Sequence, residues 1–233
     1  MPDWLVNTAL TFSSHILSVL IFLPLVGAIG VLLINKERHE TIRRFALAFS
    51  IAELLVCLSM LVDFKTNTAL MQFAEYKPWI PAFGISYHIG IDGISVLLVF
   101  LTALLTPICI LSSWTAITKK VKEYFMFLLL LEVGMIGVFL SLDLILFYVF
   151  WEAMLIPMYF LIGVWGYERR VYAAVKFILF TMAGSVLMLI AILTVAYLHS
   201  AATGAYSFGY EAWLKLGLPI GTQVWLFLAF AVA

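Results

Sequence analysis

Residues 144–166 form a run of 23 amino acids in which the one charged residue is Glu152, near the middle. A helix that crosses the hydrocarbon core of a membrane needs about 20 mostly apolar residues, so this run is long enough to span it. A carboxylate at the centre of such a helix costs about 2.5–3.5 kcal/mol on insertion scales. A residue of this kind normally faces a helix bundle or a water-filled cavity, where it takes part in ion or proton movement.

The composition extends this interpretation to the whole chain. Hydrophobic residues make up 65% of the 233 residues and charged residues 11%, whereas soluble domains carry about 25% charged residues. We therefore predict an all-α polytopic membrane protein in the lipid bilayer. The formal net charge is zero, which gives no indication of nucleic-acid binding. The two cysteines, Cys57 and Cys109, lack metal-ligand spacing and are interpreted as packing residues.

The apolar runs predict six complete spanning helices and the beginning of a seventh. The complete helices are expected at residues 15–34, 45–62, 94–114, 124–142, 144–166 and 172–198. The seventh, residues 223–233, would be about 16 Å long, roughly half the hydrocarbon thickness. We therefore expect one membrane domain, residues 1–233, that is the amino-terminal fragment of a longer subunit. The alternative is that a partner buries the end of the chain.

Basic residues predict the orientation. No Lys or Arg precedes Lys36, so the basic region of a cleaved signal peptide is missing and the first helix is expected to be retained. Ten of the 13 Lys and Arg residues lie at loops on one side of the predicted helices and three at the other side. By the positive-inside rule, the first set is cytoplasmic and the amino terminus is outside.

Two connecting segments predict secondary structure of their own. Residues 83–92 alternate apolar with small or polar residues, a pattern typical of a strand. We expect a short external β-element here, packed on the outer ends of the helices. His88 in this element is interpreted as a surface or interface residue rather than a proton carrier. Residues 209–216 predict a short interfacial helix, with Trp213 at the level of the lipid headgroups.

Glu132 and Glu152 are related through the turn between their helices. Each lies ten residues from Leu142, so on antiparallel helices the two glutamates would share a depth of about 15 Å from the turn. Whether they face each other depends on helix rotation, which stays open. If they do, one carboxyl group should hold its proton, because adjacent carboxylates disfavour joint ionisation.

The surroundings of Glu152 add polar groups to its helix. Pro157 has no N–H to bond the carbonyl of Ala153, which leaves an acceptor beside the glutamate. Tyr148 and Tyr159 are expected on the same helix face as Glu152. These groups could hold a short water chain. The alternative is a packing kink with an acid that only binds a neighbouring helix.

Two further ionisable residues, Glu53 and Lys176, can each be interpreted as structural rather than functional. Glu53 shares its helix face with Ser50 and Cys57, which favours a helix–helix contact over a transport role. Lys176 lies one turn inside the sixth predicted helix. It could extend to the cytoplasmic interface, or it could be a proton-relay residue in an internal ion pair.

Three segments carry a resemblance to a known family. Residues 143–166, with the core FYVFWEAMLIPMY, residues 78–95 (PWIPAFGISYHIGIDGIS) and residues 173–177 (AAVKF) resemble the antiporter-like chain M (chain 4) subunits of proton-pumping NADH:quinone oxidoreductase, respiratory complex I. The resemblance covers essentially the whole chain. Subunits of multisubunit cation/proton antiporters and of membrane-bound hydrogenases share the fold of this family.

The resemblance implies a proton-translocating subunit of an enzyme, with a role for particular residues. Glu152 occupies the position of a glutamate that pairs with a lysine of the seventh helix across the proton path, and that lysine is not in this sequence. Together with Glu132 and Lys176, Glu152 is the candidate proton-relay set. The resemblance implies no cofactor and no metal in this chain. NADH, FMN, iron–sulfur clusters and quinone would be bound by other subunits of the complex.

The implied partners are the other membrane subunits of complex I, including neighbouring antiporter-like subunits. The implied location is a bacterial inner membrane. Two alternatives stay open: a subunit of a sodium/proton antiporter or membrane-bound hydrogenase of the same fold, and a structural scaffold whose charges only hold helices together.

Overall fold

The computed structural model describes residues 15–233, and the contacts of the chain divide it into two compact units. Within the described residues, the first unit comprises residues 15–75 and Ile89–Leu140, and the second comprises Tyr76–His88 and Ser141–Ala233. Each unit is described by itself below. The prediction of a single membrane domain stays a prediction. The prediction about the amino terminus concerns residues 1–14, which lie outside the described residues.

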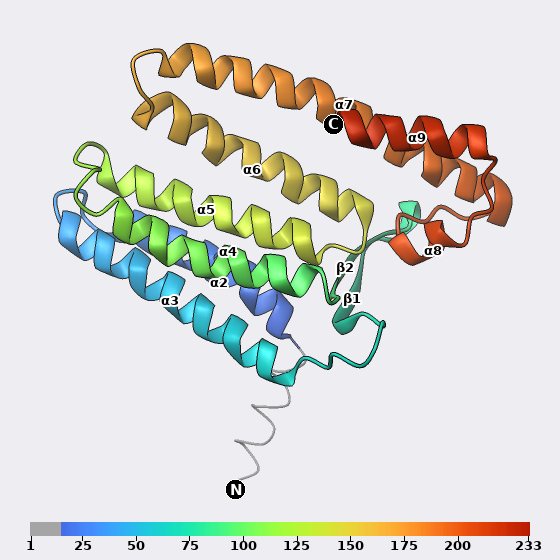
Figure 1. Ribbon diagram of the computed structural model, residues 1–233, viewed down its shortest axis with the longest axis horizontal. Helices are drawn as coiled ribbons and strands as arrows, with labels where there is room; N and C mark the ends of the chain where they lie inside the picture. Colours follow the sequence, from blue (N-terminus) through green and yellow to red (C-terminus); the bar gives the residue numbers. More distant parts are fainter. Residues whose placement is uncertain (1–14) are drawn as a thin grey trace, which may run out of the picture. The chain divides into compact units, whose positions relative to one another are not determined.

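In the part of the first unit that the structure describes, four helices pack together (Figure 1). They are α2 (Ile16–Leu33), α3 (His39–Asp63), α4 (Ser95–Ser112) and α5 (Val121–Leu140). Helix α2 packs against α3 and α5, and α3 packs against α4 and α5. One buried apolar cluster joins these helices, and its members are Ala28, Val31, Ile42, Ala46, Ile110, Val121, Phe125 and Leu129.

The second unit holds the remaining helices. They are α6 (Leu144–Trp165), α7 (Arg170–Thr203), the short α8 (Tyr210–Leu214) and α9 (Ile220–Val232). Helix α6 packs along α7, and α7 packs against α9. Gly184 of α7 allows this second contact, because an added Cβ would lie 3.0 Å from the backbone of Ala233.

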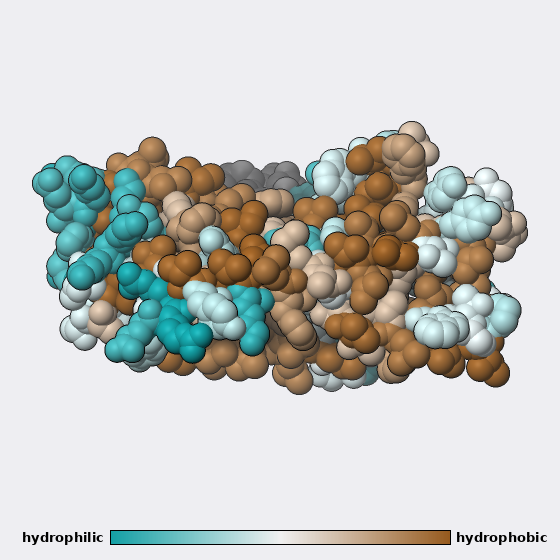
Figure 2. Space-filling model, turned by 90° about the horizontal axis from the view of Figure 1, so that it is seen from above, coloured by the Kyte–Doolittle hydropathy of each residue, from teal (hydrophilic) through white to brown (hydrophobic). Residues whose placement is uncertain are grey.

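Six of the described helices are long and apolar enough to cross a membrane, which confirms the predicted number. They are α2 to α7; the apolar helix α9 is shorter, with 13 residues. Many large apolar side chains on these helices are exposed, among them Leu55, Leu97, Phe180 and Leu193. Figure 2 shows apolar side chains over much of the face in view. Exposed side chains of this kind suit contact with lipid rather than water.

Two predicted helix boundaries were wrong by several residues. Helix α3 begins at His39 instead of residue 45, because its charged first turns are helical and carry the Glu40–Arg43 ion pair. Helix α7 runs for 34 residues, from Arg170 to Thr203, instead of residues 172–198. It ends where Gly204 takes the left-handed conformation, with φ of 83°, which glycine adopts without steric cost.

The β-element is a two-stranded sheet of β1 (Gln72–Ile80) and β2 (Ile85–Ile91). Strand β2 confirms the predicted strand, whereas β1, which contains Pro78, was not predicted. A turn of 3-10 helix, Pro81–Phe83, connects the strands and ends at Gly84, with φ of 68°. An added Cβ at Gly84 would lie 2.2 Å from the carbonyl oxygen of Tyr206, so this position requires glycine.

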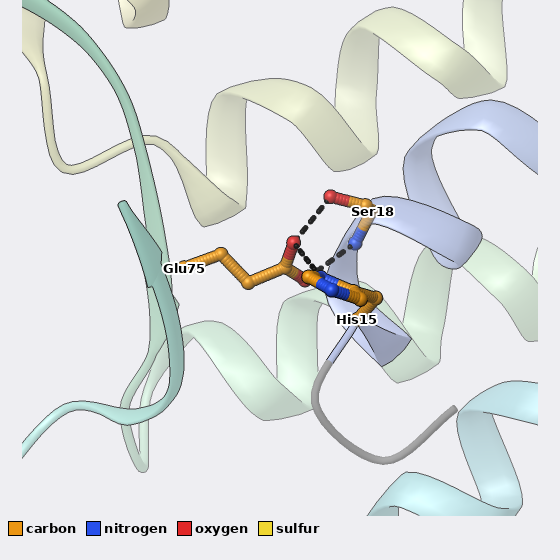
Figure 3. A network of polar contacts seen from close by, with 3 residues as sticks. All are labelled: His15, Ser18 and Glu75. Atoms are coloured by element: carbon orange, nitrogen blue, oxygen red, sulfur yellow. Dashed lines mark hydrogen bonds and ion pairs between the residues drawn. The ribbon is translucent and has the colours of Figure 1, made fainter. Parts of the chain in front are cut away.

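Glu75 of β1 holds the beginning of α2 in the first unit. Its carboxylate accepts hydrogen bonds from the backbone N–H and the hydroxyl of Ser18, at 3.0 and 2.6 Å. The ring of His15 lies 3.1 Å from the same carboxylate (Figure 3). The first N–H groups of a helix have no partner within the helix, and they favour a negative charge. Glu75 is 7% exposed and serves as a cap supplied by a strand.

Asp143 has the same role at the beginning of α6 in the second unit. It is fully buried and accepts from the backbone N–H groups of Ile145 and Leu146. Ser86 of β2 donates both its N–H and its hydroxyl to the other carboxylate oxygen, at 2.8 and 3.0 Å. Asp143 therefore ties β2 to α6. The short helix α8 confirms the predicted helix near residues 209–216, with the Trp213 indole donating to the carbonyl of Ser207.

Replacing Glu75 by alanine should lower the stability of the fold by about 1.5–3 kcal/mol, because charged hydrogen bonds to Ser18 are lost. Thermal unfolding of the detergent-solubilised subunit measures this as a lower Tm. Glu37→Ala serves as the control, since Glu37 is exposed and should leave Tm unchanged. Equal Tm values for the two variants would contradict the capping role.

His88 predicts a pH dependence of stability. Burial lowers the pKa of His88 below its ordinary value of 6.5, and the negative charges of Glu211 and Asp143 oppose this more weakly. Below about pH 6.5 the unfolded chain therefore binds more protons at this residue than the folded chain, so stability falls as the pH decreases. His88→Phe keeps an aromatic ring beside Tyr76, which His88 contacts edge-on at 5.4 Å.

The measurement is Tm between about pH 8 and about pH 5 for the wild type and His88→Phe. The wild type should lose stability relative to the variant toward the acidic end. Parallel curves would show that His88 does not carry the effect.

Candidate proton-transfer site

Glu152 lies in the middle of α6, in the second unit, and is half-buried. Its Oε1 atom is buried and has no hydrogen-bond partner among the described residues. A buried carboxyl oxygen without a partner costs free energy, unless it gains a proton, a water molecule or an ionic partner. The Oε1 atom of Glu152 can therefore still bind a proton or accept a hydrogen bond.

Tyr148 and Ser185 are the polar groups beside Glu152. Tyr148 lies one helical turn before it on α6, and its hydroxyl is close enough to interact with the Glu152 carboxyl group. The same hydroxyl interacts with Ser185 of α7. The predicted approach of Tyr148 to Glu152 is therefore confirmed. Ser185 was missed, although it is a polar residue in a largely apolar helix, because only the α6–α7 packing brings it to the tyrosine.

Two other groups were predicted near Glu152, the free carbonyl of Ala153 and the side chain of Tyr159, and their approach to it stays a prediction. Pro157 is buried inside α6, and the residue whose carbonyl it leaves free, Ala153, is exposed. Tyr159 packs edge-on against Phe160, with ring centroids 5.5 Å apart. A water chain along this face of α6 stays a prediction.

Lys176 is exposed on α7. It lies among apolar side chains that include Tyr172, Val175 and Leu179. Among the described residues it forms no ion pair within 4.0 Å. This position suits a lysine that extends along an apolar helix face toward an interface. The relay role of Lys176 stays a prediction.

Glu132 lies in the first unit, on α5, and the structure brings it to Glu53 of α3. Both side chains are 0% exposed, and the two carboxyl groups are close enough to interact directly. None of their four oxygens meets the geometry of a hydrogen bond. Glu53 was not among the predicted relay residues. The position of Glu53 in an apolar helix could have marked it as a candidate. Its pairing with Glu132 could not be predicted, because it depends on the packing of α3 against α5.

The predicted relation between Glu132 and Glu152 stays a prediction, because the two residues belong to different units. No group of three or more His, Cys, Asp or Glu side chains that could hold a metal ion is found among residues 15–233. Of the two cysteines, Cys57 is buried and Cys109 is exposed, and both are free.

Two family models match the chain. Residues 19–138 match the amino terminus of NADH-ubiquinone oxidoreductase chain 4. Residues 141–233 match the transmembrane region of the NADH:quinone oxidoreductase/Mrp antiporter family. Together they cover α2 to α9, except for residues 16–18 of α2 and the last two residues of α5.

Curated relatives agree with the family models. The chain is 39% identical over 226 residues to NADH-quinone oxidoreductase subunit M of Rickettsia prowazekii, covering 93% of this chain and 45% of the relative. It is 42% identical over 228 residues to the subunit M of Rhodobacter capsulatus, covering 93% of this chain and 44% of the relative. The chain therefore spans less than half the length of these relatives.

Solved structures show the same fold. A chain of respiratory complex I from Thermus thermophilus matches with a TM-score of 0.78 and 28% identity, over 93% of this chain and 43% of that chain. A chain of the Mrp complex from Dietzia matches with a TM-score of 0.72, over 95% of this chain and 23% of that chain. At 18% identity, the second likeness concerns the fold alone.

The first family model covers more than half of the chain. On this basis the chain belongs to the NADH-ubiquinone oxidoreductase chain 4 (subunit M) family.

Proposed function

We propose that this chain is part of a proton-translocating membrane subunit of NADH:quinone oxidoreductase, with Glu152 as the residue that binds the transported proton. The observation that carries the proposal is the buried Oε1 of Glu152, which has no hydrogen-bond partner among the described residues. Family membership supports the enzyme complex, and the geometry of the second unit supports the residue.

A proton can reach Glu152 through groups that both donate and accept. The Tyr148 hydroxyl interacts with both Glu152 and Ser185, and a phenol can donate its proton to a carboxylate while accepting one from another hydroxyl. The Ser185 hydroxyl donates to the carbonyl of Met182, at 3.2 Å. Ser185 would therefore have to rotate its hydroxyl to pass a proton to Tyr148, which is a fast local motion.

The driving force in this proposal is electrostatic. Quinone reduction elsewhere in the complex changes the charge near Glu152, and a lysine of the longer subunit pairs with the glutamate or separates from it. An opposite charge within about 4–6 Å favours the ionised form of an acid, so the pair controls whether Glu152 holds a proton. Lys176 is proposed as a second relay residue, nearer the cytoplasmic end of α7.

The chemistry of electron transfer belongs to other subunits in this proposal. NADH, FMN, iron–sulfur clusters and quinone are bound outside this chain. The neighbours are antiporter-like and other membrane subunits of the same complex. The subunit lies in a bacterial inner membrane, with its amino terminus outside.

The alternative is a subunit of a sodium/proton antiporter or of a membrane-bound hydrogenase. This alternative is retained because the chain shares its fold with a chain of the Mrp complex. Vesicles that contain the assembled complex distinguish the two. Proton movement that depends on NADH supports the oxidoreductase, and sodium-dependent proton movement without NADH supports the antiporter.

Glu152→Gln in the full-length subunit should preserve assembly and reduce proton pumping by about an order of magnitude or more, because glutamine has a similar shape but cannot carry a proton. NADH oxidation and proton uptake are recorded together in membrane vesicles, after a native gel has shown assembly. Glu168→Gln is the control, since Glu168 is an exposed acid in the loop after α6. Normal pumping by assembled Glu152→Gln would overturn the role of Glu152.

Glu132→Gln should reduce pumping less than Glu152→Gln does. The reason is that Glu132 belongs to the first unit and retains Glu53 as a neighbouring acid. The same vesicles give the comparison. A loss equal to or greater than that of Glu152→Gln would reverse the ranking of these two residues.

A further inference from the structure

The first unit contains two acids that the proposed relay does not use as a pair. We propose that Glu53 and Glu132 form a carboxylic acid pair that binds one proton between its two carboxyl groups. This would be a proton site additional to Glu152, on α3 and α5. The inference rests on the geometry of the first unit and does not depend on the relay at Glu152.

The two acids are buried without hydrogen bonds from the described residues that would compensate for a charge. Both side chains are 0% exposed, and all four carboxyl oxygens lack a hydrogen-bond partner among the described residues. Burying an isolated ionised carboxylate is so costly that the group neutralises instead. Two such carboxylates in contact add mutual repulsion to this cost. The pair with two negative charges is therefore the least stable of its protonation states.

The described helices around the pair carry no positive charge near it. Helices α2 and α4, which pack in the same unit, contain no Asp, Glu, Lys, Arg or His. On α3 the nearest basic residue is Arg44, nine residues before Glu53, and on α5 it is Lys122, ten residues before Glu132. These spacings correspond to about 14 and 15 Å along a helix. Neither residue can act as a direct ionic partner.

Two further polar groups, Thr106 and Cys57, interact with the pair. The hydroxyl of Thr106, on α4, lies beside Glu132, but it donates its hydrogen to the carbonyl of Thr102 at 3.2 Å. Cys57, one turn after Glu53, interacts with Glu53 as a further titratable group, and a thiol is only a weak donor. The pair therefore lacks a strong hydrogen-bond donor, and protonation of one of its two carboxyl groups would supply one.

A shared proton supplies the missing bond in a simple way. The O–H group of one protonated carboxyl donates to an oxygen of the other carboxylate, so the pair carries one negative charge. Transfer of that proton across the hydrogen bond exchanges the roles of the two acids and leaves the total charge unchanged. Binding of a second proton makes the pair neutral.

The alternative occupant is a metal cation such as sodium. Hard cations take about six or more oxygen ligands. Among the described residues, the side-chain oxygens that interact at this site are the four of the two carboxyl groups and the hydroxyl of Thr106, which is fewer than a shell of six. The proton is therefore the occupant that fits, and the sodium ion becomes an outcome of the test.

Infrared spectroscopy tests the proposal in the assembled complex, with the full-length subunit in lipid vesicles at neutral pH. The readout is the carbonyl stretch of protonated carboxylic acids, identified by its shift in heavy water. The double variant Glu53→Gln/Glu132→Gln should lose the signal of at least one protonated carboxyl group relative to the wild type. Glu123→Gln is the matched control, because Glu123 is an exposed acid on the same helix α5, and it should leave the signal unchanged.

The single variants keep the proposal testable if the double variant does not assemble. Since the proton is shared, Glu53→Gln and Glu132→Gln should each change the frequency or the intensity of the band. A spectrum unaffected by all three changes would overturn the proposal. Loss of the band on adding sodium chloride, but not choline chloride, would also overturn it in favour of a cation site.

Discussion

The low polarity of a membrane interior is the constraint on which the rest of this structure depends. An acid placed there must be paired, hydrated or protonated, because water does not stabilise its charge. Burial away from water imposes the same requirement at the ends of the helices, and the buried acids of this chain meet it in two ways. Glu75 and Asp143 are buried and have their carboxylate oxygens occupied by N–H and hydroxyl donors. The buried oxygens of Glu53, Glu132 and Glu152 have none among the described residues.

This contrast separates structural acids from candidate proton sites. A carboxylate that accepts several hydrogen bonds is stabilised in its charged form and holds two elements together. Glu75 attaches β1 to α2, and Asp143 attaches β2 to α6, so the sheet anchors one helix in each unit. A buried oxygen without a donor instead has capacity for a proton. We therefore propose the three glutamates in the spanning helices, Glu53, Glu132 and Glu152, as the residues that bind protons in this fold.

Much of the fold could be predicted from apolar periodicity. The six spanning helices and strand β2 follow from residue patterns that act locally along the chain. Helix boundaries were less predictable: hydropathy does not register the charged but helical first turns of α3, nor the polar last turns of α7. Strand β1 was not predicted; it contains Pro78, which a strand at the edge of a sheet tolerates.

The candidate site was predictable in part. Glu152 and Tyr148 lie one turn apart on one helix, so their approach follows from helix geometry alone. The contacts of Ser185 with Tyr148 and of Glu53 with Glu132 join different helices. They depend on helix rotation and packing, which a single sequence does not determine. Glu53 was consequently interpreted as a helix contact, whereas the structure places its carboxyl group beside a second buried acid.

The most direct test compares Glu152, a candidate proton site, with Asp143, a structural acid whose carboxylate accepts hydrogen bonds. Protons moved per NADH oxidised would be measured for Glu152→Gln and Asp143→Asn in vesicles, normalised to the amount of assembled complex. The account predicts that Glu152→Gln lowers transport at normal assembly. It predicts that Asp143→Asn lowers assembly or stability, while the assembled fraction pumps normally. Normal pumping with Glu152→Gln, together with lost pumping in fully assembled Asp143→Asn, would contradict it.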